Sequence, residues 1–306
     1  MSETERGSEH VVLVALDGSS AATAAVPVAC TVARQLNAQV EALYVATGEA
    51  AETDVRSRLG LNTRDYAHIP LRIAHGDPAE EILRAGEDPR VALVVLATHG
   101  RRIRPGGALA PVPRRVAAGT SRPVLLVRPE AAPAQQHLPF FRRLLFPVDG
   151  TPTTVDAFAT ATELAARLGT EIDVLFVVYP KQAAPVERGT MTPPYYVDQP
   201  HHEWPAWQTR VAHWIRRHCA DLPQETVIRA RVVRARNLTE VGEVIARFAA
   251  ERAADGIVLV RRSHLEHGRA AILRAVLERT PCPVLLVAGE PQRVGRLRQR
   301  PREAVA

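Results

Sequence analysis

The sequence predicts an α/β fold of two tandem domains, each a doubly wound parallel sheet of five strands. Three observations support this fold. The chain of 306 residues repeats itself, apolar runs alternate with helix-forming segments in each copy, and the runs are apolar at almost every position. Runs of that kind are typical of strands buried on both faces, which pair in parallel and are joined by right-handed helical crossovers.

The repeat is visible at both ends of each copy. Residues 13–19 (LVALDGS) match residues 145–151 (LFPVDGT) at an offset of 132, and residues 122–127 (RPVLLV) match residues 282–287 (CPVLLV) at an offset of 160. The second copy is therefore 28 residues longer between its matched ends. We expect domain 1 at residues 9–129, domain 2 at residues 142–289, an exposed linker between them and a basic tail at residues 290–306.

The first copy begins with a continuous apolar run, which predicts a buried strand. Ser19 or Ser20 can cap the Ala-rich helix that follows, and Asn37 suits its end. A variable segment covers residues 47–67, and the turn at 76–78 (GDP) leads into a helix with proline in its first turn. The five expected strands are residues 11–16, 39–45, 69–74, 91–97 and 124–128.

The second copy repeats these elements, with most of its additional length in an insert at about residues 179–207. Six prolines in the insert predict that it forms neither a regular helix nor a central strand. The insert is also rich in Tyr and Trp, so it is either a lid or contact surface, or a cover for an edge of its own domain. The expected strands are residues 144–148, 171–178, 227–234, 256–260 and 284–288.

Composition excludes several classes of protein. No apolar run approaches the ~20 residues of a membrane span, and the first ten residues lack the apolar core of a signal peptide. We therefore expect a soluble, cytoplasmic protein that does not enter a membrane. Cys30, Cys219 and Cys282 are widely spaced, which argues against a disulfide framework and a zinc site. We expect no metal, and we interpret Cys30 and Cys282 as small buried residues.

The chain is basic, with a formal net charge of +6, and half of this excess lies in the tail. Lys181 is its single lysine, so arginine supplies nearly all of the positive charge. A basic stretch attracts phosphate, but no aromatic and basic motif for reading bases accompanies it. Nucleic acid is therefore an unlikely partner, and a solvated tail is the preferred interpretation.

Ligands of doubly wound sheets bind beyond the carboxyl ends of the strands, where the strand order reverses. Asp17 ends the first strand of domain 1, and residues 98–101 (THGR) follow its fourth. Asp17 either accepts hydrogen bonds from a base or ribose, or orders the turn before the first helix. The same places in domain 2 hold Asp149 and the pair Arg261-Arg262. We interpret the two arginines as surface residues or, alternatively, as ligands of another anion.

In order and with this spacing, four motifs occur in domain 1: VALDGS at 14–19, GDP at 76–78, THG at 98–100 and PVLLV at 123–127. Together with their partial repetition in domain 2, they resemble the universal stress protein family, here as a tandem two-domain member. The resemblance implies Rossmann-like (adenine nucleotide alpha hydrolase-like) domains with strand order 3-2-1-4-5. It also implies an intramolecular pseudo-dimer through residues 123–128 and 283–288, which removes two exposed apolar edges.

Nucleotide-binding members of that family carry G-x2-G-x9-G-[S/T] after the fourth strand, where glycines and a helix N-terminus cradle phosphates. Domain 1 keeps the second glycine of this motif as Gly100. It has Ala97 at the first glycine, Ala110 at the third and Pro111 at the Ser/Thr position, and proline lacks both an N–H and a hydroxyl. Domain 2 has Val260 and Ser263 at the two glycines. We expect weak binding of ATP or AMP in domain 1 and no nucleotide in domain 2.

The resemblance implies which residues of domain 1 would contact the nucleotide, and it implies a regulator or sensor of the stress response. Two alternatives stay open: an interaction module with an unknown protein partner and no nucleotide, and an enzyme that hydrolyses ATP or adenylates. No catalytic residue can be identified from spacing, so we expect that the protein is not an enzyme. Whether it also forms a homodimer is open. The expected contact residues are Leu16, Asp17, Val45, Thr98, His99, Gly100, Arg101 and Val112.

Overall fold

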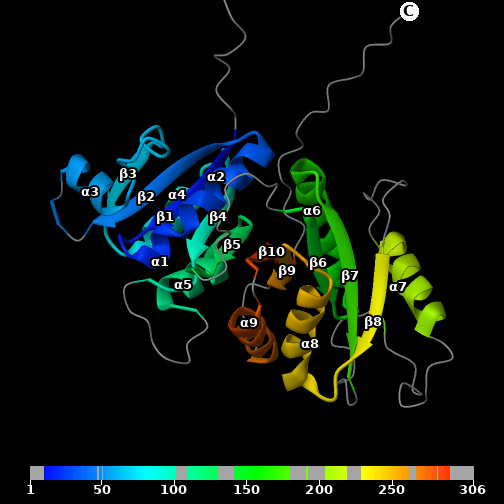
Figure 1. Ribbon diagram of the computed structural model, residues 1–306. Helices are drawn as coiled ribbons and strands as arrows, with labels where there is room; N and C mark the ends of the chain where they lie inside the picture. The colour runs from blue at the N-terminus through cyan, green and yellow to red at the C-terminus, as the bar shows by residue number, and fades with distance from the viewer. Residues whose placement is uncertain are drawn as a thin grey trace, which may run out of the picture.

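All ten strands of the protein join one continuous sheet in the order β3-β2-β1-β4-β5-β10-β9-β6-β7-β8 (Figure 1). Each half of the sheet has the expected order 3-2-1-4-5 when read from its outer edge toward the centre. The structure is a computed structural model. It describes residues 10–46, 48–49, 51–100, 109–129, 141–179, 191, 204–218, 229–261, 267–280 and 282–289.

Domain 1 follows the expected alternation of strands and helices. Its elements are β1 (Val11–Leu16), α1 (Ser20–Thr23), α2 (Ala25–Leu36), β2 (Gln39–Ala46), α3 (Glu52–Arg58), β3 (Leu71–His75), α4 (Pro78–Gly86), β4 (Val91–Ala97), α5 (Pro111–Gly119) and β5 (Val124–Val127). Their strands pair in parallel throughout the domain.

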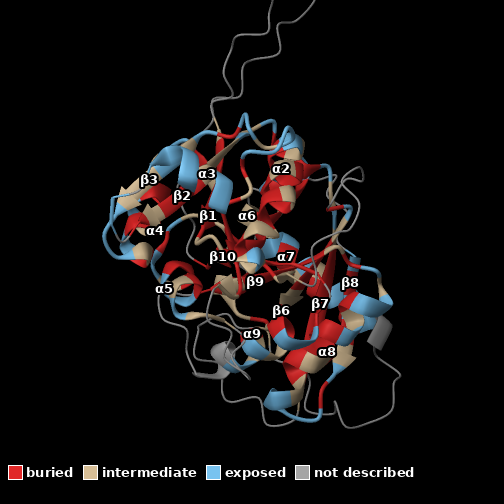
Figure 2. Cartoon of the chain, turned by 60° about the vertical axis from the view of Figure 1, so that its left-hand side comes forward, coloured by how far each residue is buried: buried red, intermediate tan, exposed pale blue. Residues whose placement is uncertain are grey.

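Domain 2 repeats the alternation with longer helices. Its elements are β6 (Arg143–Val148), α6 (Pro152–Leu168), β7 (Glu171–Val178), α7 (Trp204–His218), β8 (Arg229–Arg234), α8 (Leu238–Glu251), β9 (Gly256–Arg261), α9 (His267–Arg279) and β10 (Val284–Ala288). The buried side chains form two clusters on opposite faces of the sheet, which is the most buried layer of the molecule (Figure 2). Helices α1, α2, α3, α6 and α7 contribute to one cluster, and α4, α5, α8 and α9 to the other.

The two domains are joined by their fifth strands, as the pseudo-dimer prediction requires. Strands β5 and β10 run antiparallel, with Leu125 opposite Leu285 and Val124 opposite Leu286. All four of these side chains are buried. Pairing the two apolar edges removes both from solvent and leaves β3 and β8 as the outer edges of the sheet.

Two arginines cross this interface to matching helix ends. Arg128, just after β5, donates from Nη1 to the carbonyl oxygens of Leu277 (2.9 Å), Glu278 (3.0 Å) and Thr280 (3.3 Å) at the end of α9. Arg261 of β9 donates from Nη2 to the carbonyl oxygens of Thr120 and Arg122, just beyond α5. The last carbonyls of a helix lack partners within it, so a guanidinium is a favourable cap for them.

Local signals in the sequence explain where most helices begin and end. Ser19 caps α1, because its Oγ accepts from the Ala22 N–H at 3.1 Å, and Asn37 ends α2 in the left-handed conformation (φ 49°). Gly169 does the same at the end of α6 (φ 66°). Asp77 begins α4 by accepting from the N–H groups of Ala79 and Glu80, both at 3.0 Å.

Several boundaries differ from the sequence predictions. The first helix is interrupted at Ala24 because Pro27 has no N–H for the carbonyl of Thr23, and the third strand begins at Leu71 rather than residue 69. The third strand of domain 2 ends at Arg234 as expected, and its expected start at residue 227 lies outside the described residues. Within the insert, residues 204–207 are helical, since a proline at 205 is tolerated in a first helical turn.

The described part of the insert covers its own domain. Trp207 of α7 is buried and stacks on Phe176 of β7, with ring centroids 5.9 Å apart. Val211 and Ile215 on the same helix are also buried in this cluster. Residues 180–190 and 192–203 of the insert, and the whole tail at 290–306, lie outside the described residues.

The helix-end contacts predict that Arg128→Ala lowers the free energy of unfolding by about 1–3 kcal/mol, because three carbonyl groups at the end of α9 lose their charged donor. Urea denaturation followed by circular dichroism measures this difference. Arg90→Ala is the matched control, since exposed Arg90 pairs only locally with Asp88; it should change the value by less than about 0.5 kcal/mol. Equal losses for the two variants would contradict the capping role of Arg128.

Burial of Cys282 before β10 predicts an alkaline loss of stability. Desolvation raises the pKa of its thiol from 9.0 to about 11. The unfolded chain therefore loses this proton first, and the free energy of unfolding falls as pH rises from about 9 to about 11. Between pH 8 and pH 11, the free energy of unfolding from urea denaturation should fall by about 2 kcal/mol less in Cys282→Ala than in the parent. An unchanged pH dependence in this variant refutes the prediction.

Candidate functional site

The carboxyl ends of β1 and β4 form the place where the strand order of domain 1 reverses. The two strands are neighbours, with Ala15 opposite Leu96, so the residues that follow them meet at one edge of the sheet. Asp17 follows β1, and Thr98, His99 and Gly100 follow β4. The structure therefore brings these four predicted residues together.

Asp17 has one carboxylate oxygen on the turn and the other against Gly100. Its Oδ1 accepts from the N–H of Ser19 at 2.9 Å, which confirms that it orders the turn before α1. Its Oδ2 lies so close to the Cα of Gly100 that a Cβ at this position would collide with it. Glycine at position 100 thus leaves room for the carboxylate of Asp17, which would have to move if a larger residue stood there.

Thr98 and His99 connect the end of β4 to its surroundings. Thr98 is fully buried, its N–H donates to Val127 (2.9 Å), and its carbonyl accepts from the N–H of Ala110 (2.9 Å). Its Oγ1 lies 2.9 Å from the Nδ1 of half-buried His99. The contact with Ala110 holds the start of α5 beside the end of β4.

Helix α5 presents few N–H groups at its start. Pro111 and Pro113 both lie in its first turn and lack an N–H, so Val112 supplies the single donor of the first three residues. Pro113 was not among the predicted departures from the family motif, although the sequence PVP at 111–113 shows it beside Pro111. No side chain caps this helix either, because Ala110 has no polar group.

The remaining predicted contact residues line the same edge. Leu16 is buried at the end of β1, Val45 is half-buried near the end of β2, and Val112 is half-buried at the start of α5. Arg101 lies outside the described residues, as do Arg102, Arg104 and the glycines at 106 and 107.

The corresponding edge of domain 2 is built differently. Asp149 Oδ1 accepts from the Thr151 N–H (3.0 Å) and from the hydroxyls of Thr151 (2.7 Å) and Thr154 (2.5 Å). Met191 of the insert lies across the turn, where its N–H donates to the Gly150 carbonyl at 2.7 Å. A Cβ at Gly150 would collide with the Met191 carbonyl oxygen. This turn is therefore covered by its own domain.

The position of Arg261 differs from the sequence prediction. The preferred interpretation, a surface arginine alongside Arg262, is wrong, because Arg261 is only 5% exposed and its guanidinium joins the two domains. Its position just after the central apolar residues of β9 directs it into the interface. Arg262 and Ser263 lie outside the described residues.

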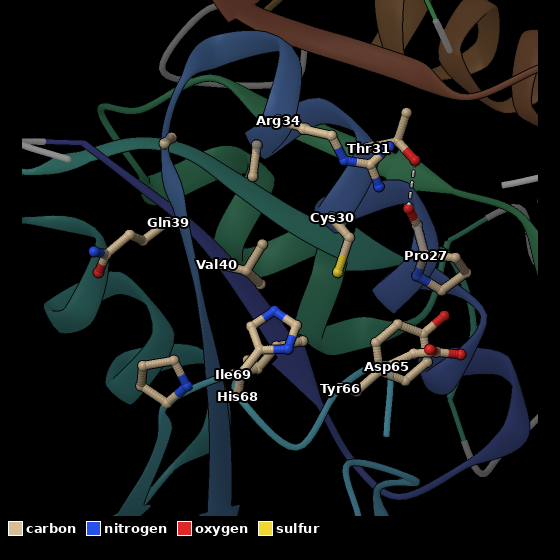
Figure 3. Close-up of a pocket in the computed structure, with 13 residues that line it drawn as sticks. Pro27, Cys30, Thr31, Arg34, Gln39, Val40, Asp65, Tyr66, His68 and Ile69 are labelled. Carbon is tan, nitrogen blue, oxygen red and sulfur yellow. Dashed lines mark hydrogen bonds between the residues drawn. The ribbon is translucent and has the colours of Figure 1, made fainter. Parts of the chain in front are cut away.

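A cavity of about 620 Å³ lies away from this edge (Figure 3). It is enclosed by α2, the start of β2 and the segment before β3, and Cys30, Tyr66 and His68 line it. Cys30 packs against the core, but it is only partly buried, because its sulfur also borders this cavity. Burial raises the pKa of the Cys30 thiol, which keeps it protonated and weakly nucleophilic near neutral pH.

Two further properties concern the described residues as a whole. Within them, no three His, Cys, Asp or Glu side chains lie close enough together to hold a metal ion. None of the helices in the described ranges is long and apolar enough to cross a membrane.

Comparisons with known proteins agree with this architecture. No curated protein sequence matches the chain. A universal stress protein from Archaeoglobus fulgidus is 13% identical with a TM-score of 0.57, and the alignment covers 92% of this chain and 99% of that one. A functionally unknown protein from Pseudomonas aeruginosa is 14% identical with a TM-score of 0.56, over 93% and 94% of the two chains. At these identities, the likeness shows the fold alone.

The sequence pattern of the "Universal stress protein family" matches residues 10–128 and 140–288. These two segments coincide with the two halves of the ten-stranded sheet and comprise most of the chain. The chain therefore belongs to the universal stress protein family, with two family domains in tandem.

Proposed function

We propose that this protein is a regulator of the stress response whose domain 1 binds an adenine nucleotide weakly. Family membership supports the role in the stress response. The observation that supports binding is the meeting of Asp17 with Gly100 where the strand order reverses, which is the usual ligand position in doubly wound sheets.

The two halves of a nucleotide would find unequal partners at this edge. Asp17 can accept hydrogen bonds from ribose hydroxyls or a base amino group, and half-buried Val45 offers apolar surface to the base. The phosphates would meet a helix start with two prolines in its first turn. Adenosine would therefore provide most of the binding free energy, and the additional phosphates of ATP would add little over AMP.

A second candidate function is an interaction module that uses no nucleotide. The specific observation that favours it is the loss of donors at Pro111 and Pro113, since N–H groups at a helix start are what usually hold a phosphate. In this function the two domains would serve as a rigid scaffold for a protein partner. Calorimetry with ATP distinguishes the two functions, because only the first gives a saturable heat.

The nucleotide hypothesis predicts the effect of two substitutions at position 17. Asp17→Asn keeps an oxygen for the Ser19 N–H but removes the second carboxylate oxygen, so it should weaken AMP binding about tenfold with little loss of stability. Asp17→Ala should lower both AMP affinity and stability. Titration calorimetry and thermal unfolding measure these effects, with Asp149→Asn as the matched control in domain 2. Absence of heat from the parent at millimolar AMP and ATP, or unchanged binding in Asp17→Asn, would refute nucleotide binding through Asp17.

The proline effect predicts a gain of affinity. The double substitution Ala110→Gly and Pro111→Ser restores one N–H and one hydroxyl at the start of α5, each worth about 0.5–1.5 kcal/mol as a hydrogen bond. ATP affinity should rise about tenfold, while adenosine affinity should stay constant because adenosine has no phosphate. The corresponding change of Ala271 to Ser in domain 2 is the control. Equal gains for ATP and adenosine would show that the phosphates are not held at α5.

A further inference from the structure

A second cavity lies where the strand order of domain 2 reverses, beyond the ends of β6 and β9. It has a volume of about 260 Å³ and extends between the sheet and helices α8 and α9. Most of its lining is apolar, contributed by Leu238, Val241 and Ile245 of α8, Leu259 of β9 and Ile272 of α9. Nothing in the predicted function of domain 2 uses this cavity.

The apolar lining is specific to domain 2, because the equivalent positions of domain 1 hold different residues. Position 241 corresponds to Glu81 of domain 1, where a carboxylate pairs with Arg84 at 2.5 Å, and position 245 corresponds to Ala85. Leu238 corresponds to Pro78 and is 40% exposed, which makes it the one large apolar side chain that is exposed among the described residues. Its position at the cavity indicates an apolar surface that a ligand would cover.

Arg261 supplies a polar group without a partner. Its side chain is 5% exposed and lines the cavity, and its Nη2 is used by the carbonyls of the other domain. Its Nε has no hydrogen-bond acceptor among the described residues, and no carboxylate of those residues pairs with its charge. A buried cation without a counterion is costly, so an anion that reached it would be held strongly.

We propose that the cavity of domain 2 binds a small apolar carboxylate, whose hydrocarbon part packs against Val241, Ile245 and Ile272 and whose carboxylate accepts from Arg261 Nε. The volume fits about nine groups the size of water at roughly 30 Å³ each, which matches a six-carbon acyl chain or one aromatic ring with a short acidic arm. The apolar lining suits such a ligand better than the polar phosphates of a nucleotide.

Asp149 and Tyr179 also border the cavity, so the carboxylate of the ligand has to lie at the Arg261 end, away from the charge of Asp149. Asp149 Oδ1 is already surrounded by the three donors from Thr151 and Thr154, which stabilise its negative charge locally. Burial and the charge of Asp149 raise the pKa of the Tyr179 phenol, so it remains a neutral hydroxyl that can donate a second hydrogen bond to a carboxylate.

The test is a titration of the full chain with hexanoate and phenylacetate, followed by the NMR signals of isoleucine methyl groups. The methyl signals of Ile245 and Ile272 should shift and saturate, while those of Ile69 and Ile73 in domain 1 stay constant. Hexanamide has the same length without the charge, so its affinity should be about tenfold lower. Because Arg261 also joins the domains, the neutral analogue tests the charge without removing this arginine.

Two variants address the cavity itself. Val241→Phe fills it and should abolish the shifts, and Leu238→Glu places a negative charge at its mouth and should weaken hexanoate binding about tenfold. Thr239→Glu is the matched control, since it adds the same charge to the same helix turn at an exposed residue that does not line the cavity. Asp17→Asn should leave hexanoate binding unchanged, so this result is independent of nucleotide binding in domain 1.

Several outcomes would overturn the proposal. They are the absence of shifts at about 10 mM of either acid, equal affinity for hexanamide and hexanoate, and undiminished binding in Val241→Phe. Saturable shifts of Ile245 and Ile272 with ATP instead of the acids would also overturn it, in favour of a nucleotide site in domain 2.

Discussion

The antiparallel pairing of β5 with β10 is the interaction on which the rest of the molecule depends. It joins two five-stranded sheets into one, buries an apolar edge of each, and fixes which helices face each other across the centre. Gln35 of α2 donates to the Leu168 carbonyl at the end of α6 (3.2 Å), and Arg128 and Arg261 cap helix ends across the same junction. These polar contacts are possible only when the strands are in register, so they make the pairing specific as well as favourable.

Much of this architecture could be predicted from the sequence because its determinants are local or repeated. Continuous apolar runs indicate buried strands, Asn37 and Gly169 end equivalent helices, and the repeat shows that one solution is used twice. The break at Ala24 was missed because it arises from Pro27, three residues farther along an otherwise favourable helix. The helical start of α7 was missed because a proline is read as a breaker unless its place in the first turn is known.

The candidate sites could be predicted only in part. Asp17, Thr98 and Gly100 follow strands that had been identified, so topology alone places them together. Arg261 could not be placed in that way, because its burial depends on helix α5 of the other domain, far away in the sequence. The cavity of domain 2 also depends on long-range packing, since Leu238, Leu259 and Ile272 belong to three elements whose spacing no local pattern encodes. Sequence patterns thus locate strand ends well but do not show what lies opposite them.

The covalent link between the halves has a consequence for how such a protein can change. In a symmetric dimer of identical chains, every substitution appears at both sites, so neither can lose its original chemistry while the other keeps it. Here the two halves are encoded separately, and the equivalent positions already hold Glu81 in one and Val241 in the other. The junction also forms within one molecule, at a high effective concentration that dilution does not lower. Each molecule therefore carries the two strand-reversal edges in a fixed one-to-one ratio, and each edge can change its chemistry without altering the other.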